Sequence, residues 1–189
     1  MKRKTFAILL IMSCVIISLA FPVLASSFEK LQEDYSKDLI KLNLLKGYPD
    51  GSLHLENKIK RSEYVTFAIR MAGYENIDAS SVKLSFKDVT KSNWAYNNIK
   101  IALKCGLVSG YPDNTFAPEK NVTYPEALMV LIRALGYEKT LKGKWPDNVI
   151  SKAKELGISK DIDLPASREI TRGEMTVLVH NSLTVDIKQ

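Results

Sequence analysis

The feature that most constrains the fold of this chain is an internal duplication. Gly47, Glu63 and Arg70 each recur 63 residues later, and the Gly-Tyr-Glu tripeptide at residues 73–75 recurs at residues 136–138. Identical residues at one constant offset indicate tandem structural units, each of which buries its apolar face against its neighbour. The sequence therefore predicts a repeat protein.

A third and shorter copy follows the first two. Trp94 recurs as Trp145 at an offset of 51, whereas Glu126 recurs as Glu174 at an offset of 48, so three residues are missing between the two markers. We expect the repeats to occupy residues 26–80, 81–140 and 141–189, with the third one degenerate.

Each copy has the apolar periodicity of two amphipathic helices. In the first copy apolar residues recur at spacings of three and four over residues 28–45, which predicts a helix there. Further helices are expected to begin after Ile59, at Trp94, near Ala127, at Trp145 and near Thr171. Strand signals are almost absent, so we expect a mainly α fold of three helix-loop-helix units.

The loop within each unit carries turn and capping chemistry. Residues 110–114 read Gly-Tyr-Pro-Asp-Asn, a cluster of residues that favours tight turns. Thr123 and Glu126 then match a capping box, in which each side chain bonds the backbone amide of the other residue. The first copy keeps the loop as Gly-Tyr-Pro-Asp-Gly at residues 47–51, and the third keeps only the cap, at Thr171 and Glu174.

The first 25 residues have the pattern of a signal peptide. Three basic residues at positions 2–4 precede an uncharged apolar run over 5–21, and Val-Leu-Ala at 23–25 fits cleavage before Ser26. A retained membrane anchor is the alternative. Without the leader the net charge is 27 − 3 − 21 = +3, which is too mild for a nucleic-acid-binding face. We expect an exported protein with no nucleic-acid partner.

Catalytic and metal-binding patterns are missing from the sequence. The two histidines, His54 and His180, lie in no triad or zinc spacing, and Asp161-x-Asp163 lacks the rest of a calcium loop. We therefore expect no enzyme, no cofactor and no metal site. Cys105 is the single cysteine after the leader, which excludes an internal disulfide and favours a small buried hydrophobe.

The motifs together resemble the S-layer homology (SLH) family. Its repeats carry an F-x-D-V segment, a Trp-led helix, a G-Y-P-D-G-T-F loop and an I-T-R-A-E helix start; this chain has counterparts at 86–89, Trp94, 110–116 and 122–126 of the second copy, with partial matches in the other two. The resemblance implies a pseudo-threefold trefoil around a central helix bundle. It also implies that the protein is secreted, stays with the cell wall or S-layer, and binds secondary cell wall polysaccharide, often pyruvylated, in grooves between repeats.

The resemblance also implies the binding residues. They are the arginines of the I-T-R-A-E motifs, the tryptophans and the loop residues: Arg61, Arg172, Trp94, Trp145, Gly47, Tyr48, Asp50, Gly110, Tyr111 and Asp113. The chemistry is consistent, because an Arg fork beside the free amides of a helix N-terminus suits a carboxylate, and aromatic faces suit sugar rings. The alternative is that the caps only start helices and that the tryptophans belong to the core.

Because the copies depart from the family motif, we expect only one or two of the grooves to be able to bind the polysaccharide. Tyr124 stands where the second copy should have its arginine, so we expect the groove of loop 106–126 to be the poorer site. The first copy has Lys60 at the capping Thr position and Leu31 at the Trp position. An exported protein-protein interaction module on an SLH scaffold, without carbohydrate binding, is the alternative function.

Overall fold

The computed structural model describes residues 27–188, so the predicted signal peptide and its cleavage site lie outside the described residues. Residues 27–41 are helical. The remaining elements are α2 (Arg61–Met71), α3 (Tyr96–Lys104), α4 (Tyr124–Ala134), the 3₁₀ helix η1 (Glu138–Thr140), α5 (Asp147–Glu155) and α6 (Arg172–Ser182). Over the described range there are isolated β-bridges but no strands, which confirms the mainly α prediction.

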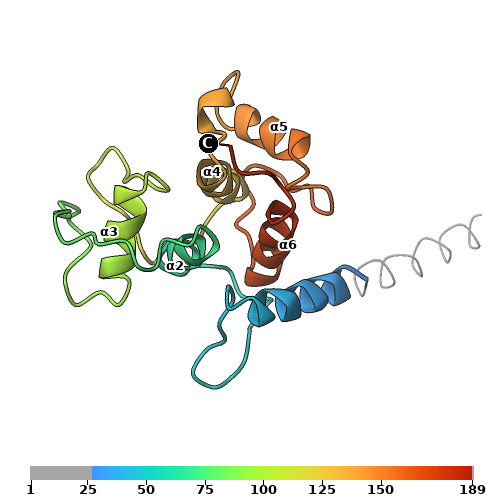
Figure 1. Cartoon of the computed structure of the whole chain (residues 1–189), viewed down its shortest axis with the longest axis horizontal. Coiled ribbons are helices and arrows are strands. Elements are labelled where there is room, and N and C mark those ends of the chain that lie inside the picture. Colours follow the sequence, from blue (N-terminus) through green and yellow to red (C-terminus); the bar gives the residue numbers. More distant parts are fainter. Residues whose placement is uncertain (1–26, 189) are drawn as a thin grey trace, which may run out of the picture.

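The three helices α2, α4 and α6 lie around the centre of the molecule, and the other helices lie outside them (Figure 1). The segments that lead into these three helices are joined by a closed ring of backbone hydrogen bonds. Ile59 donates to Ile170 (3.1 Å), Ile170 donates to Val122 (2.9 Å), and Val122 donates to Ile59 (3.0 Å). All three side chains are buried. The ring makes each unit a neighbour of both others, so the third unit contacts the first.

Buried tyrosines connect the central helices. The Tyr64 ring on α2 is 2% exposed, and its hydroxyl donates to the Ala127 carbonyl of α4 at 2.8 Å. Burial of a side chain of this size contributes roughly 2–3 kcal/mol, provided that its hydroxyl finds an acceptor. The tyrosine therefore fixes the distance between the first two units.

The first helix ends earlier than its periodicity predicts. It stops at residue 41, Leu42 is 56% exposed, and Asn43 adopts a left-handed φ of 58°. The amides of Leu44 and Leu45 both donate to the Leu39 carbonyl, so the chain turns back and still buries Leu45. A helix up to residue 45 is therefore wrong, because this turn reproduces the apolar spacing without helical backbone.

The helix expected at Trp94 begins two residues later. The Asn93 side chain accepts from the Ala95 amide at 2.9 Å, and α3 starts at Tyr96. Cys105, the C-cap of α3, is only partly buried against the core, and burial raises the pKa of its thiol. Within residues 27–188 no helix combines the length and the hydropathy that a membrane span needs.

Candidate functional site

Two pockets of matching composition lie between the units, with volumes of about 170 and about 270 Å³. The first pocket contains Gly47, Tyr48, Glu63, Arg70, Trp94 and Arg172. The second pocket contains Gly110, Tyr111, Glu126, Arg133, Trp145 and Arg61.

Residues of all three units line each pocket. The arginine that contacts each loop comes from a different unit than the loop itself. Arg172, at the start of α6, reaches the loop at residues 46–53, more than a hundred residues earlier in the chain. Arg61, at the start of α2, reaches the loop at residues 109–116. Loop 106–126, which the sequence analysis judged by Tyr124 of its own copy, therefore has its arginine from another unit.

Arg172 holds the loop of the first pocket through its guanidinium group. Its Nε donates to the Leu53 carbonyl at 2.8 Å and one terminal nitrogen to the Lys46 carbonyl at 3.3 Å. The group stacks over the Tyr48 ring at 4.6 Å and lies 3.7 Å from the Glu63 carboxylate. With 8% of its side chain exposed, it is a buried cation balanced by one carboxylate.

Arg61 makes the same set of contacts in the second pocket. Its Nε donates to the Phe116 carbonyl at 2.9 Å, and its guanidinium lies over the Tyr111 ring at 4.7 Å and 3.7 Å from Glu126. The side chain is 11% exposed. Both arginines thus use part of their hydrogen-bonding fork to fix a loop, which the sequence did not predict.

The helix N-termini are also less free than expected. The Arg172 amide donates to the Asn57 carbonyl at 2.8 Å, and the Arg61 amide donates to the Lys120 carbonyl at 2.9 Å. These amides join the units together, so the expectation of free amides for an anion at this position is wrong. What the pockets offer an anion is guanidinium charge.

A glutamate at the floor of each pocket links the helix cap to the tyrosine. One oxygen of Glu63 accepts from the Lys60 amide at 2.9 Å, and the other accepts from the Tyr48 hydroxyl at 2.6 Å. Glu126 does the same with the Thr123 amide and the Tyr111 hydroxyl, at 2.9 and 2.7 Å. These glutamates do more than start helices, and Lys60 leaves the carboxylate half of the capping box intact.

These contacts shift the ionisation of the pocket groups. Burial, together with the hydrogen bond to Glu63, raises the pKa of Tyr48 to about 12. The pKa of Tyr111 is raised by the same two causes, burial and the hydrogen bond to Glu126. Burial opposes ionisation of Glu126, but hydrogen bonds from Thr123 and Tyr111 and the charge of Arg61 outweigh it and lower its pKa. Near neutral pH the tyrosines are therefore neutral hydrogen-bond donors, and the Glu126 carboxylate is ionised.

Two further arginines, which the sequence analysis did not select, complete the pockets. Arg70 and Arg133 each expose 20% of the side chain, compared with 11% for Arg61 and 8% for Arg172. Arg70 pairs with Glu75 at 3.3 Å and Arg133 with Glu138 at 2.9 Å. The constant offset of 63 already marked this pair of residues, so the repeat itself was the signal that could have found them.

The tryptophans are open to solvent at the edges of the pockets. Trp94 is 61% exposed and Trp145 is 51% exposed, so the alternative that they belong to the core is wrong. A large aromatic face left in water beside a polar pocket is unusual for a residue with only a packing role. It is the arrangement that a stacking surface for a ring requires.

The loop residues divide into two groups. A side-chain carbon on Gly110 would meet the Phe86 ring and, at 2.9 Å, the Thr115 carbonyl, and one on Gly47 would meet the Ser52 carbonyl at 2.9 Å. The glycines therefore allow close approach of the loop backbone. Asp50 and Asp113 accept hydrogen bonds from residues 52 and 115 and hold the turns, and neither lines a pocket.

The position that would form a third pocket lacks the residues of the other two, although a hollow lined by Arg168, Thr171 and Glu174 lies there. Tyr124, in the arginine slot, is fully buried, and its hydroxyl donates to the Ile162 carbonyl at 3.2 Å. Asn181 stands 48 residues after Arg133 and is 1% exposed, while Glu174 pairs with Arg168 at 2.9 Å. Since Arg61 contacts loop 106–126, this loop does not lack a guanidinium, which was the reason to expect a poorer site there.

The histidines and the two aspartates near residue 162 have other contacts. His54 lies between Asp50 and Glu56 on the loop, and His180 stacks on Tyr35 with ring centroids 3.6 Å apart. Asp163 pairs with Lys154. Across the described residues no three His, Cys, Asp or Glu side chains are grouped to hold a metal.

Comparison with known proteins assigns the family. The S-layer homology domain model matches residues 85–128, which include α3, the second loop and the start of α4. The chain belongs to the S-layer homology family. The family model and the pockets meet in the same stretch, since Gly110, Tyr111 and Glu126 lie inside the match.

Relatives of this S-layer homology chain extend the similarity over most of its length. It is 36% identical to the middle cell wall protein of Brevibacillus brevis over 154 residues, and 31% identical to a surface layer protein of Brevibacillus choshinensis over 166 residues. These matches cover 81% and 87% of this chain but only 14% and 15% of the relatives. The cellulosome-anchoring protein of Acetivibrio thermocellus is 33% identical over 156 residues, which is 74% of this chain and 35% of that protein.

Proposed function

We propose that this chain attaches non-covalently to the bacterial cell wall by binding wall polysaccharide in the two pockets. Its family and its relatives, which are cell-wall, surface-layer and anchoring proteins, place it at the cell surface in association with the wall. The observation that carries the proposal is the repetition of one constellation: an exposed tryptophan beside a pair of arginines, twice in one chain.

Each part of the constellation has a role in this proposal. The ring of Trp94 or Trp145 stacks on the face of a sugar ring, and this apolar contact does not by itself select one sugar over another. Arg70 or Arg133, the more exposed of the arginines, meets an acidic substituent such as the carboxylate of a pyruvyl ketal, through charge-assisted hydrogen bonds. Arg61 and Arg172 keep the loops and tyrosines in place. Binding, with no bond made or broken, is all that this arrangement requires.

Two pockets on one chain also raise the strength of attachment. The polymer presents many equivalent ends. Once the first pocket is occupied, the concentration of ends near the second pocket is therefore high, and the combined affinity exceeds that of either pocket alone. Weak binding in each pocket is then sufficient for stable retention.

The test is co-sedimentation with purified cell walls that carry pyruvylated polysaccharide, before and after mild acid removal of the ketals. We expect binding to intact walls and strongly reduced binding to stripped walls. Trp94→Ala and Trp145→Ala each lower the affinity about tenfold, the range expected for loss of one stacked ring, and the double variant stays in solution. Ile187→Ala removes another exposed apolar side chain, outside both pockets, and serves as the control.

Equal sedimentation with stripped and intact walls removes the pyruvyl group from the proposal. Unchanged wall binding by the double tryptophan variant removes the pockets, and the alternative of a protein-protein interaction module then takes precedence.

A further inference from the structure

The two pockets agree in their interior and differ at their edges. In each one, two arginines pair with two glutamates, of which one lines the pocket. Lys120 contacts Tyr111 of the second pocket, and Lys144 directly precedes Trp145 of the same pocket; neither lysine lines the pocket itself. The offsets of 63 and 51 place Asn57 and Asn93 at the same two positions of the first pocket. At these two positions the second pocket has lysines where the first has asparagines, whereas Lys46 lines the first pocket where Ser109 lines the second.

The two lysines lie next to residues of the second pocket and come from different loops. Lys120 donates to the Tyr111 hydroxyl at 3.2 Å, and its ammonium lies 4.7 Å from the centre of that ring. Lys144 directly precedes Trp145, so its Cα is about 3.8 Å from that of the tryptophan. Tyr111 and Trp145 both line the pocket, and both lysines are exposed.

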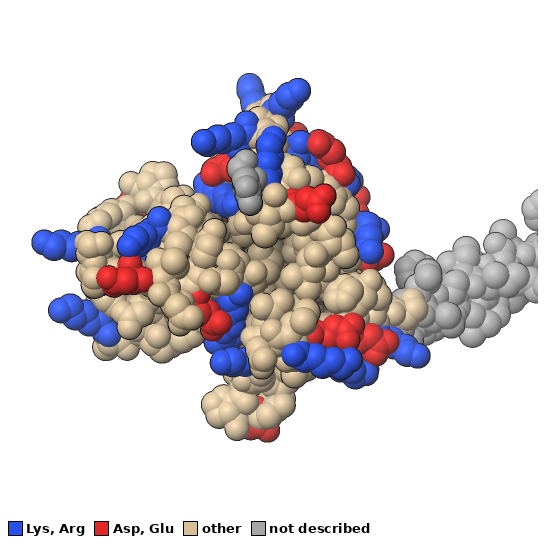
Figure 2. Space-filling view, viewed as in Figure 1, with Lys and Arg blue, Asp and Glu red and all other residues tan. Residues whose placement is uncertain are grey.

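The charge of these lysines is not neutralised locally. Among residues 27–188 no carboxylate lies within ion-pair distance of Lys120, Lys142 or Lys144, although acidic groups pair with other basic residues of both pockets. Figure 2 shows blue side chains gathered at the top of the view, over the segment between η1 and α5 that contains residues 142 and 144. The Debye length at physiological salt is about 8–10 Å, so charges beside Trp145 and Tyr111 still act on a ligand bound in the pocket.

We propose that Lys120 and Lys144 form a second anion-binding position at the edge of the second pocket. That pocket then prefers wall polymer with an additional acidic group, carboxylate or phosphate, next to the residue that contacts Trp145 and the arginines. The first pocket has asparagines at both places, so this lysine pair is absent there. The inference rests on the proposed function, and it makes the two pockets unequal in ligand preference.

The experiment separates the pockets by using single-tryptophan backgrounds of the whole chain. Trp94→Ala leaves the second pocket to be measured, and Trp145→Ala leaves the first. Into the Trp94→Ala background we introduce Lys120→Asn together with Lys144→Asn. Asparagine is the residue that the first pocket has at both equivalent positions. Affinity for soluble wall polysaccharide is then measured by calorimetry from about 20 to about 300 mM salt, a range over which screening rises steeply.

We expect the lysine substitutions to weaken binding about fivefold for each lysine at low salt, the effect of one unit charge at contact distance in water. The loss shrinks as salt rises, because the interaction is between solvent-exposed charges. The same pair of substitutions in the Trp145→Ala background has no effect, and Asn57→Lys there raises both the affinity and its dependence on salt. Amidation of the polymer's carboxylates removes the lysine effect if the extra group is a carboxylate and preserves it if the group is phosphate.

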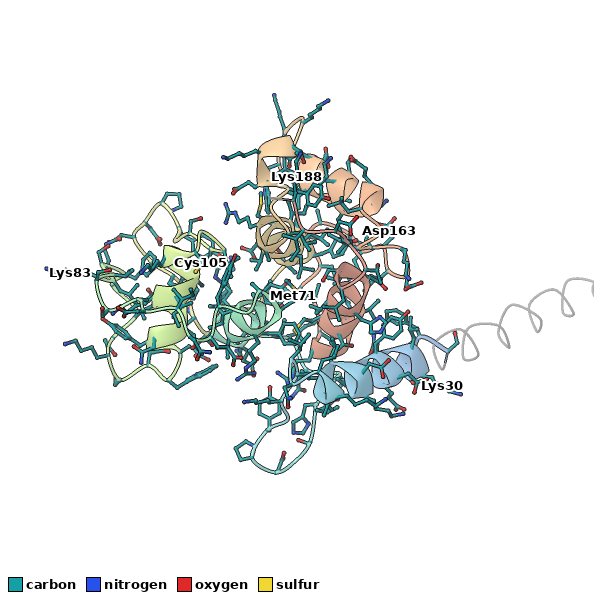
Figure 3. The ribbon with its side chains drawn as sticks, in the orientation of Figure 1. Lys30, Met71, Lys83, Cys105, Asp163 and Lys188 are labelled. Carbon is teal, nitrogen blue, oxygen red and sulfur yellow. The ribbon has the colours of Figure 1, made fainter. Side chains whose placement is uncertain are left out.

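The matched control removes two positive charges elsewhere. Lys30 and Lys83 lie at opposite outer edges of the molecule (Figure 3), and neither lines either pocket. Lys30→Asn with Lys83→Asn tests whether net charge alone matters, and thermal melts check that every variant is folded. The inference about Lys120 and Lys144 is wrong if their substitution and this control weaken binding equally. It is also wrong if neither weakens binding while the tryptophans are required. In both cases the proposed function stands. If the tryptophans are not needed, the proposed function itself fails.

Discussion

Replacement of Arg61 by alanine tests whether this arginine is first of all a structural connection between units. Its Nε–carbonyl bond to Phe116 is charge-assisted and worth about 1.5–3 kcal/mol. Its contacts with the Tyr111 and Phe116 rings, at 4.7 and 4.8 Å, contribute about 0.5–1 kcal/mol each. Since these terms overlap, we expect Arg61→Ala to lower the free energy of unfolding by about 3 kcal/mol, with Glu126 left without its cation.

The assay is urea denaturation of the whole chain, followed by circular dichroism. A loss of this size corresponds to a fall in melting temperature of about 6–12 °C for a domain of this length. Arg61→Lys keeps the charge but not the planar fork and should fall between the parent and the alanine variant. The m-value should stay constant, which shows that the unfolded surface is unchanged.

The matched control lies on the same helix. Arg70 pairs with Glu75, whose side chain is 55% exposed, so Arg70→Ala should cost less than about 1 kcal/mol. Wall binding should show the opposite order at equal folded fraction, with the larger effect for Arg70 in the first pocket than for Arg61. A loss below about 1 kcal/mol for Arg61→Ala would refute the conclusion that its fork holds the loop.

Two further predictions concern the loops. Because the folded-state pKa of Tyr48 is raised from 10.0 to about 12, its contribution to stability is complete below pH 10 and is lost as the pH rises towards 12; alkaline melts should show this decline, and Tyr48→Phe should reduce it. Gly110→Ala should destabilise the chain by about 2 kcal/mol because the new carbon meets the Phe86 ring and the Thr115 carbonyl. Phe86→Ala in the same chain should make the combined cost smaller than the sum of the two single costs, and a purely additive result would contradict the contact.

Much of the site could be identified from the sequence, because its residues follow the repeat. The offset of 63 pairs Gly47 with Gly110 and Tyr48 with Tyr111, and it pairs Arg70 with Arg133 although we did not select them. Capping boxes are local patterns, and the one at Thr171 is present as predicted. Residue type and spacing are sufficient for such features, since the interacting groups lie within a few residues of one another.

The sequence was less informative where a residue has both a local and a distant role. Asp50 and Asp113 were selected with the loop motif, but they bond their own turns and lie outside the pockets. Leu42 fits the apolar period of the first helix, yet the chain leaves the helix at residue 41 and exposes it. Periodicity cannot show where a turn replaces the next helical residue, because both can place apolar side chains towards the core.

By itself the sequence determined that this protein is built of repeated helical units with turn-rich loops and capped helices. Tertiary structure decided which loop meets which arginine. The ring of hydrogen bonds among Ile59, Val122 and Ile170 closes the three units on one another, so that Arg61 reaches the second loop and Arg172 returns to the first. The physical reason is that pairing across a closed arrangement depends on the relative placement of whole units, which no spacing along the chain encodes. Tyr124 therefore looked like a defect in the best-preserved copy, although it belongs to the core and the pocket beside it has its arginine from elsewhere.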